Sequence, residues 1–304
     1  MARGLRIMID IPTALILGAG ASMDFAYPSA RGLKDDVLDI TRETNSDAYR
    51  CLLDLGFENT VISAFSHELR FSGRPSVDAF LEHRHEFIPV GKAAMTLALI
   101  GLENINTLFK TGENWYEYLF NRMEAPFDEF ASNQVRFITF NYDRSLESFL
   151  FRVLQSAYGK SPDEVADVLP SIPIIHVHGK LGDLPWESRN GRNYESTMDP
   201  HEVLKAAQGI RIISEASPVD EAFARAISCI AISQRIVFLG FGYHAANLKR
   251  LRLDNSLDQR LWGSCFGMTD RERAEVEHHF RPRPITLGAP HAKALQFLRE
   301  ELPL

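Results

Sequence analysis

The stretch that decides the fold runs Thr13-Ala14-Leu15-Ile16-Leu17 and continues directly into Gly18-Ala19-Gly20-Ala21-Ser22. The apolar run is typical of a buried parallel strand, and the small residues predict a tight loop followed by a helix start. Glycine takes backbone angles closed to other residues and leaves no Cβ in the way of a ligand. The helix start directs free N–H groups and its positive dipole end at the same place, so we expect an anion there, most simply a phosphate.

This loop matches only part of the dinucleotide-binding fingerprint. Gly-x-Gly is present, but Met23 stands where a third Gly or Ala is expected. An ordinary strand-to-helix turn is therefore the alternative interpretation of the loop. The residues at the other strand ends have to distinguish a phosphate-binding loop from an ordinary turn.

Composition limits the class of protein. The 304 residues suit one α/β domain with a sizeable insertion, and the hydrophobic fraction of 45% and charged fraction of 24% are those of a globular chain. The formal net charge is −7 and the basic residues are scattered, so we expect no direct binding of nucleic acid.

The location in the cell is predicted from cysteines and hydrophobic runs. The three cysteines are odd in number and form no CxxC pair, which indicates a reducing cytoplasm and no zinc knuckle. The longest hydrophobic stretch, residues 93–102, is far too short to span a membrane. The first six residues precede no apolar segment of signal-peptide length. We therefore expect a cytoplasmic protein without membrane contact.

The chain divides into two kinds of sequence. Residues 45–134 give successive helical patterns with almost no strand signal, whereas strand patterns alternate with helices elsewhere. The alternation predicts a doubly wound parallel, Rossmann-like sheet built from residues 1–44 and 135–304, with residues 45–134 as a helical insertion or lid. Within that insertion, His83 and His85 do not share a helix face, so we interpret them as surface residues.

Three further strands end in residues that carry chemistry. The strand 135–140 is followed by Asn141-Tyr142-Asp143, the strand 172–179 ends in His178-Gly179, and the strand 235–239 ends in Gly240-Phe241-Gly242. In an open α/β sheet these ends face one crevice, the usual ligand site. Asn and Asp also cap helices, so capping alone is the simpler interpretation of Asn141 and Asp143.

Two histidines and one long loop belong to the end of the strand 172–179. Strand alternation places His176 and His178 on one face, with His176 one pleat deeper and thus a structural residue. A metal pair of these two lacks an evident third ligand, so we predict no metal. Residues 182–200 are rich in Gly, Asn, Ser and Pro and predict a long loop near the same edge, where long loops are often functional.

Taken in order, these motifs resemble the sirtuin-like family, and more closely its bacterial branch of NAD-consuming antiphage defence proteins. The matching residues, spread from residue 13 to about 250, are Gly18, Ala19, Gly20, Ala21 and Ser22, then Thr139 with Asn141 and Asp143, then His178 with Gly179, then Gly240 and Gly242 with Asn247. The resemblance implies that the first glycine loop holds the NAD pyrophosphate. It further implies that Asn141 and Asp143 lie beside the nicotinamide ribose and that His178 is the catalytic base.

Two departures from the family matter for the activity. Deacylases of the family carry a four-cysteine zinc module, which this chain cannot build. They also have Pro-Asp-Phe-Arg after the glycine loop, where this chain has Met23-Asp24-Phe25-Ala26. Both departures speak against lysine deacylation.

The residue types suit hydrolysis of NAD on their own account. Breaking the bond from ribose C1′ to nicotinamide develops oxocarbenium charge, and the leaving group needs no strong acid. A histidine can act as base toward a ribose hydroxyl or the attacking water. Asn141 can hold water or ribose without adding charge. Asp143 either stabilises the cation or orients its neighbours.

Three functions remain open at this point. The first is an NAD glycohydrolase that depletes NAD as a defence effector, with NAD as substrate and no metal. The second is a non-hydrolytic module that senses NAD and regulates a partner, and the third is an NAD-dependent deacylase. Since uncontrolled NAD loss kills the host, the resemblance implies control by homo-oligomerisation or by a partner in trans, such as a hexameric helicase-like ATPase.

Overall fold

The computed structural model describes residues 8–110, 112–212, 220–253 and 259–304. The segment used above against an export signal lies outside these ranges. The core is one six-stranded parallel sheet in the order β3-β2-β1-β4-β5-β6, which confirms the predicted doubly wound fold. Its strands are β1 (Thr13–Leu17), β2 (Val135–Thr139), β3 (Ile174–His176), β4 (Arg235–Leu239), β5 (Arg260–Gly263) and β6 (Ile285–Leu287).

Helices cover both faces of the sheet, which is why β1 is buried along its whole length. Leu15 and Leu17 pack toward one helical layer, whereas Ala14 and Ile16 pack toward the other. The first layer contains α8 (Trp115–Arg122), α9 (Ser145–Tyr158), α10 (Pro162–Val168) and α15 (Ala294–Glu300). The second contains α12 (Glu221–Ala231), α13 (Ala245–Arg250) and α14 (Asp270–His279).

The register of the central strands places their carboxyl ends at one level. Leu17 of β1 pairs with Thr139 of β2 and with Leu239 of β4, and Thr139 pairs with His176 of β3. The sheet order reverses at β1, so the loops after β1 and β4 lie side by side. Ligands of open α/β sheets bind at such a switch point.

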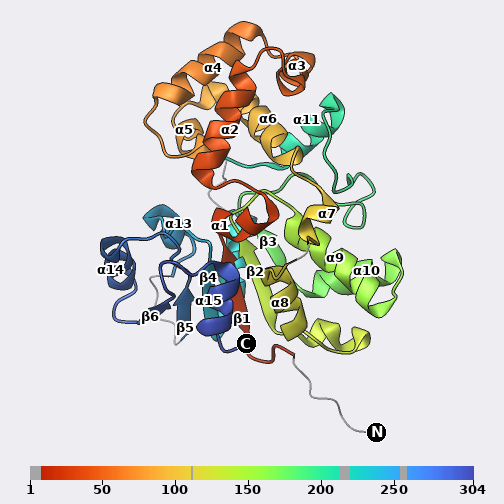
Figure 1. Cartoon of the computed structure of the whole chain (residues 1–304), viewed down its shortest axis with the longest axis vertical. Coiled ribbons are helices and arrows are strands. Elements are labelled where there is room, and N and C mark those ends of the chain that lie inside the picture. Colours follow the sequence, from red (N-terminus) through yellow and green to blue (C-terminus); the bar gives the residue numbers. More distant parts are fainter. Residues whose placement is uncertain (1–7, 111, 213–219, 254–258) are drawn as a thin grey trace.

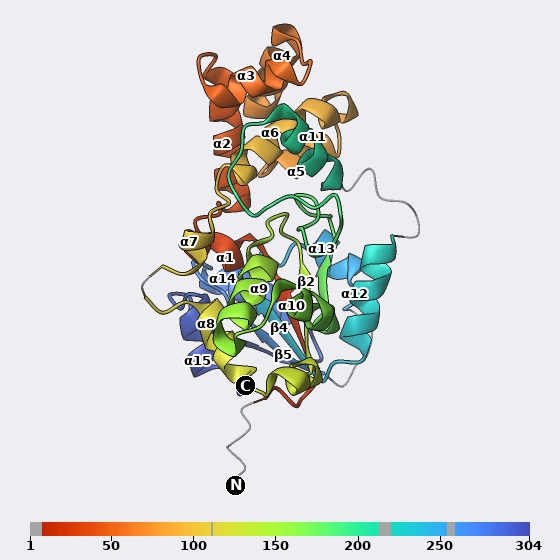
Figure 2. The same cartoon turned by 90° about the vertical axis from the view of Figure 1, so that its right-hand side faces the viewer.

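A separate lobe of helices stands above this edge of the sheet (Figures 1 and 2). The apolar helix α6 is buried almost all round, which is the pattern of a helix at the centre of a bundle. The lobe consists of α2 (Ala30–Arg42), α3 (Asp47–Asp54), α4 (Asn59–Phe71), α5 (Val77–Leu81), α6 (Ile88–Ile100) and α11 (Pro200–Gly209). We call these six helices the helical lobe.

The helical lobe differs from the predicted insertion 45–134 at both ends. It also takes in α2, which precedes residue 45, and α11, which lies beyond residue 134, because both pack on α6. In contrast, α7 (Ile105–Leu108) and α8 return to the sheet and pack against α9. Two parts of the chain that are distant in sequence, residues 30–100 and α11, therefore build the lobe.

Candidate functional site

The glycine loops after β1 and β4 touch each other backbone to backbone. The N–H of Gly18 donates to the carbonyl of Leu239 (3.0 Å), and the N–H of Gly20 donates to the carbonyl of Gly240 (3.0 Å). A Cβ on Gly240 would lie 2.0 Å from the backbone nitrogen of Ala21, and Gly240 also has a φ of +59°. The glycines are thus required by the contact between the two loops, and the Gly20 N–H is already used there.

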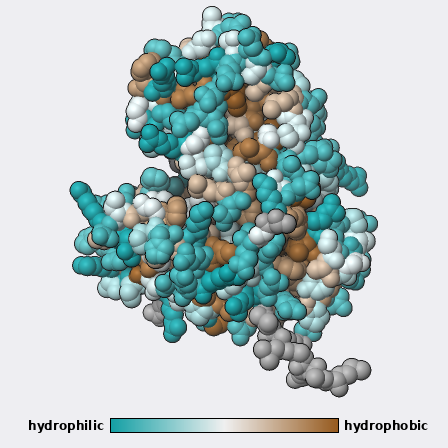
Figure 3. All heavy atoms as spheres, viewed as in Figure 1, coloured by the Kyte–Doolittle hydropathy of each residue, from teal (hydrophilic) through white to brown (hydrophobic). Residues whose placement is uncertain are grey.

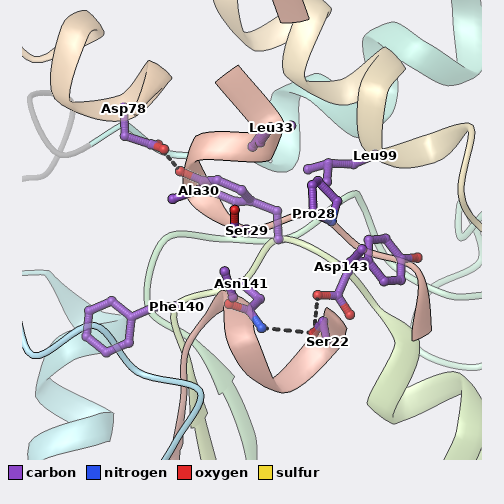
Figure 4. A pocket seen from close by; sticks show the side chains of 13 residues that line it. Ser22, Pro28, Ser29, Ala30, Leu33, Asp78, Leu99, Phe140, Asn141 and Asp143 are labelled. Carbon is purple, nitrogen blue, oxygen red and sulfur yellow. Dashed lines mark hydrogen bonds between the residues drawn. The ribbon is translucent and has the colours of Figure 1, made fainter. Parts of the chain in front are cut away.

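Asn141 is held rigidly at the end of β2. Its side-chain nitrogen donates to the carbonyl oxygen of Gly18 (3.0 Å) and to Oγ of Ser22 (2.9 Å). Its backbone N–H donates to Oγ1 of Thr139 (3.0 Å). Both amide hydrogens are therefore used, and among the described residues none donates to Oδ1, which is left as an acceptor for a ligand (Figure 4).

Asp143 is buried beside Asn141 and shares the Ser22 hydroxyl with it. Ser22 Oγ donates to Oδ2 of Asp143 (2.8 Å), while Oδ1 accepts from the backbone N–H of Ser145 (3.1 Å) and from its hydroxyl. Burial raises the pKa of the Asp143 carboxyl, although these hydrogen bonds lower it. One oxygen therefore accepts from Ser145, the first residue of α9, although the N-cap of that helix is Arg144 and has no side-chain cap; the other oxygen joins the network around Asn141.

Ser22, Asn141 and Asp143 line a cavity of about 90 Å³. The cavity lies where the helical lobe meets the sheet edge, and the molecule is hollowed between these two parts on the left of Figure 3. Its lining residues are Ala19, Ser22, Tyr27, Pro28, Ser29, Ala30, Leu33, Asp78, Leu99, Phe140, Asn141, Tyr142 and Asp143. The set contains two carboxyl groups and no lysine or arginine.

His176 is a structural residue, as predicted. Its ring nitrogens contact the carbonyl oxygen of Asn141 (2.8 Å) and Oε1 of Glu147 in α9 (2.6 Å). Burial disfavours the Glu147 carboxylate, but the charge and hydrogen bond of His176 outweigh it, so the pKa of Glu147 falls to about 2. His176 therefore fixes the backbone that carries Asn141.

The prediction that His176 and His178 share one face is wrong. The strand β3 ends at His176, and the backbone turns before Gly179, whose φ is +72°. His176 consequently faces α9, whereas His178 packs edge-to-face on Phe140 (5.5 Å between ring centroids) and on Phe223 of α12 (5.6 Å). The alternation rule fails because it holds only inside a strand.

His178 is held in an apolar pocket beside a cation. It is 8% exposed, and none of the described residues makes a hydrogen bond to its ring nitrogens. Arg250 of α13 stacks on the Phe223 ring at 3.7 Å and pairs with Asp220 (3.2 Å). Burial and, after it, the positive charge of Arg250 lower the pKa of His178 to about 4. The imidazole is thus neutral at pH 7.

The structure brings the predicted residues together unequally. Gly18, Ser22, Asn141 and Asp143 form one network, whereas His178 does not line the cavity and packs on Phe140, which does. Ala19 lines the cavity without joining this network. Three further predicted residues lie outside the cavity lining: the carbonyl of Ala21 accepts from Trp115 (2.7 Å), Gly242 is exposed, and Asn247 lies in α13.

The long loop 182–200 is anchored by a buried ion network. Glu103, which lies between α6 and α7, pairs with Arg144 (2.8 Å) and with Arg192 of the loop, and all three side chains are almost fully buried. Tyr194 of the same loop bonds to Tyr27 at the cavity (2.8 Å). No sequence pattern identifies these partners, because they lie far apart along the chain.

The sequence also did not predict two further contacts near the site. Tyr116 contacts the Ser145 hydroxyl (2.7 Å), and Asp78 brings a carboxyl from the helical lobe to the cavity. The spacing of Asp143 and Ser145 is that of an Asx turn and could have indicated the Ser145 contact. Nothing in the sequence indicates the Asp78 contact.

The described residues contain neither a metal-binding cluster nor a membrane span. No group of three or more His, Cys, Asp or Glu residues within the described ranges could hold a metal ion. His83 and His85 are exposed, as expected for surface residues. In the part of the chain that the structure describes, every helix is too short or too polar to cross a bilayer.

Comparison with known proteins adds no assignment. No family model matches the chain, and no curated protein is significantly similar to it. The resemblance of the four motifs to sirtuin-like proteins therefore stays a prediction.

Proposed function

We propose that this chain is an NAD⁺ glycohydrolase, which converts NAD⁺ and water into nicotinamide, ADP-ribose and a proton. The observation that carries the proposal is the fixed side chain of Asn141, whose Oδ1 is left as an acceptor beside a cavity at the switch point of the sheet. The buried Asp143 carboxyl lies next to it. This arrangement suits a site that has to orient a ribose and a water molecule.

The charge of the cavity supports the nicotinamide end of NAD⁺ as its occupant. Asp78 and Asp143 line it, and none of its lining residues is a lysine or arginine. A pyridinium ring is cationic before the bond breaks, and the ribose becomes cationic as it breaks. Carboxyl groups beside the cavity favour both of these positive charges over the negative charge of a phosphate.

His178 is the proposed base. A neutral imidazole can accept a proton from a ribose hydroxyl or from the attacking water, and the surroundings of His178 keep it neutral at pH 7. The proposal requires the ribose to extend from the cavity past Phe140 to His178. Phe140 lines the cavity, and its ring packs on His178.

The cellular role belongs to the same proposal. By its motifs the chain acts as an effector of bacterial antiphage defence that depletes cytoplasmic NAD, as a homo-oligomer or with a partner such as a hexameric helicase-like ATPase. Induced expression of the wild type is expected to lower cellular NAD, and expression of Asn141→Ala is expected to leave it unchanged.

A non-hydrolytic NAD sensor is the second candidate, and one observation favours it. Both amide hydrogens of Asn141 are engaged within the protein, and His178 is outside the cavity lining. A site arranged in this way could bind the ligand without turning it over.

Product release separates the candidates. The purified chain is incubated with NAD⁺, and nicotinamide and ADP-ribose are followed over time by chromatography. We expect both products from the wild type, and losses of at least about 100-fold in Asn141→Ala and His178→Ala. His83→Ala and Asn190→Ala change the same residue types at exposed positions and are the matched controls. NAD⁺ binding without any product, with co-purified partners present, would replace the hydrolase by the sensor.

A further inference from the structure

Tyr142 stands between Asn141 and Asp143, and its side chain leaves the sheet edge toward the helical lobe. The hydroxyl donates a hydrogen bond to Oδ1 of Asp78 in α5, and the ring is 8% exposed. The backbone carbonyl of Tyr142 accepts from the N–H of Leu181 (3.0 Å) on the other side. The segment that carries both candidate site residues is therefore held from two directions.

Asp78 is itself firmly placed in the helical lobe. It lies in the first turn of α5, which Ser76 caps by accepting from the N–H of Ala79 (3.2 Å). The neighbouring residues Phe80 and Leu81 are buried in the lobe. Leu81 also packs so closely on α6 that a Cβ on Gly91 would lie 2.8 Å from it. A movement of the lobe would consequently carry Asp78 with it.

Asp78 is the polar one among the cavity-lining residues that lie within lobe helices, and Ser29, which is also polar, is the N-cap of α2. The other lining residues from lobe helices are Ala30 and Leu33 of α2 and Leu99 of α6, which are apolar. Apolar contacts can slide, whereas a hydrogen bond fixes both a distance and a direction. The bond from Tyr142 to Asp78, drawn as the dashed line at Asp78 in Figure 4, thus ties the position of the lobe to the segment 141–143.

We propose that Asp78 is a positioning residue, which acts through Tyr142 to hold Asn141 and Asp143 in the geometry of the candidate site. This inference deepens the proposed function and rests on it for any effect on NAD⁺ hydrolysis. The positional link itself is a property of the protein without substrate. It can therefore be measured separately from the reaction.

Amide hydrogen exchange measures the link directly. We compare peptides covering residues 140–146 in the wild type, Asp78→Ala, Tyr142→Phe and the double variant. Loss of the bond is expected to speed exchange about tenfold in each single variant. The double variant is expected to match the singles, because both remove the same interaction. Asp78→Asn keeps an acceptor oxygen and is expected to stay within about threefold of the wild type.

Unchanged exchange in Tyr142→Phe, or additive effects of about 100-fold in the double variant, would overturn the proposal. Tyr142→Phe removes a single oxygen atom, so the test stands even where Asp78→Ala does not fold. Tyr158→Phe is the matched control, because it removes a hydrogen bond to the carbonyl of Ala125 (2.7 Å) at the opposite end of α9.

Hydrolysis provides the second measurement. We expect kcat/KM for NAD⁺ to fall about tenfold in Tyr142→Phe and to change less than about twofold in Tyr158→Phe. If the wild type hydrolyses no NAD⁺, the proposed function is wrong, and the exchange data alone test the positioning role of Asp78. A hydrolysing wild type whose Tyr142→Phe variant keeps full activity defeats the positioning role.

Discussion

The two halves of the candidate site are built in opposite ways. In the polar half, Ser22, Asn141 and Asp143 are joined by hydrogen bonds to one another and to the backbone of Gly18. In the aromatic half, His178 is placed by ring contacts to Phe140 and Phe223 and has no hydrogen bond from its ring to any described residue. The polar half is oriented before a ligand arrives, whereas the aromatic half keeps a proton acceptor neutral and uncommitted.

The largest expected effect comes from breaking the loop contact beneath the polar half. Gly240→Ala places a Cβ 2.0 Å from the backbone nitrogen of Ala21. The nearest atoms belong to the backbone of Gly20 and Ala21, which cannot move aside as a side chain can. We expect a loss of at least about 4 kcal/mol in the free energy of unfolding, measured by urea denaturation.

Gly159→Ala separates this clash from simple backbone strain. Gly159 has a φ of +64°, close to that of Gly240, but a Cβ there would meet nothing within 4 Å. We expect a loss of only about 1 kcal/mol, the cost of a left-handed conformation for alanine. Equal losses in the two variants would show that the loop contact contributes little.

The aromatic half predicts a dependence of stability on pH. The pKa of His178 is about 4 in the folded protein, below the value of about 6.5 expected when it is unfolded. Between these values the unfolded chain binds a proton that the folded protein does not, so stability falls as the pH falls from about 6.5 to 4. His178 therefore lowers the free energy of unfolding by about 3 kcal/mol at pH 4 and does not change it above pH 7.

His178→Gln removes the titrating imidazole and with it this pH dependence of stability. Urea denaturation at pH 7 and pH 4 is expected to show the wild type losing about 3 kcal/mol more than the variant across that range. Identical losses would mean that burial and Arg250 do not keep the imidazole neutral. Titration of the His178 ring by NMR gives the same pKa independently of unfolding.

A smaller effect is expected at the centre of the polar half. Ser22→Ala leaves Oδ2 of the buried Asp143 without its hydrogen-bond donor, which is expected to cost about 2 kcal/mol in the free energy of unfolding. Ser228→Ala removes a comparable hydroxyl, bonded to the carbonyl of Ala224 (3.0 Å) on an exposed face, and is expected to cost less than about 0.5 kcal/mol. Similar costs at both positions would show that the network is not buried from water.

The sequence predicted the two halves of the site to different extents. The polar half was predicted as a group, because strand ends of a parallel sheet meet at one edge and Asn141 and Asp143 follow β2 immediately. The position of His178 was predicted to the correct strand end but to the wrong face, because β3 stops at His176 and the chain turns. Asp78 and Glu103 were not predicted, since their partners come from other parts of the chain.

The sequence by itself determined the parallel sheet, the strand ends that carry the motifs and the helical character of residues 45–134. These features follow from local periodicity and from residues whose backbone preferences are intrinsic. Only the tertiary structure decided that the glycines serve the contact between two loops, that α2 and α11 join the helical lobe, and that His178 lies among aromatic rings. Contacts of this kind depend on how distant segments pack, and no local pattern along the chain records that packing.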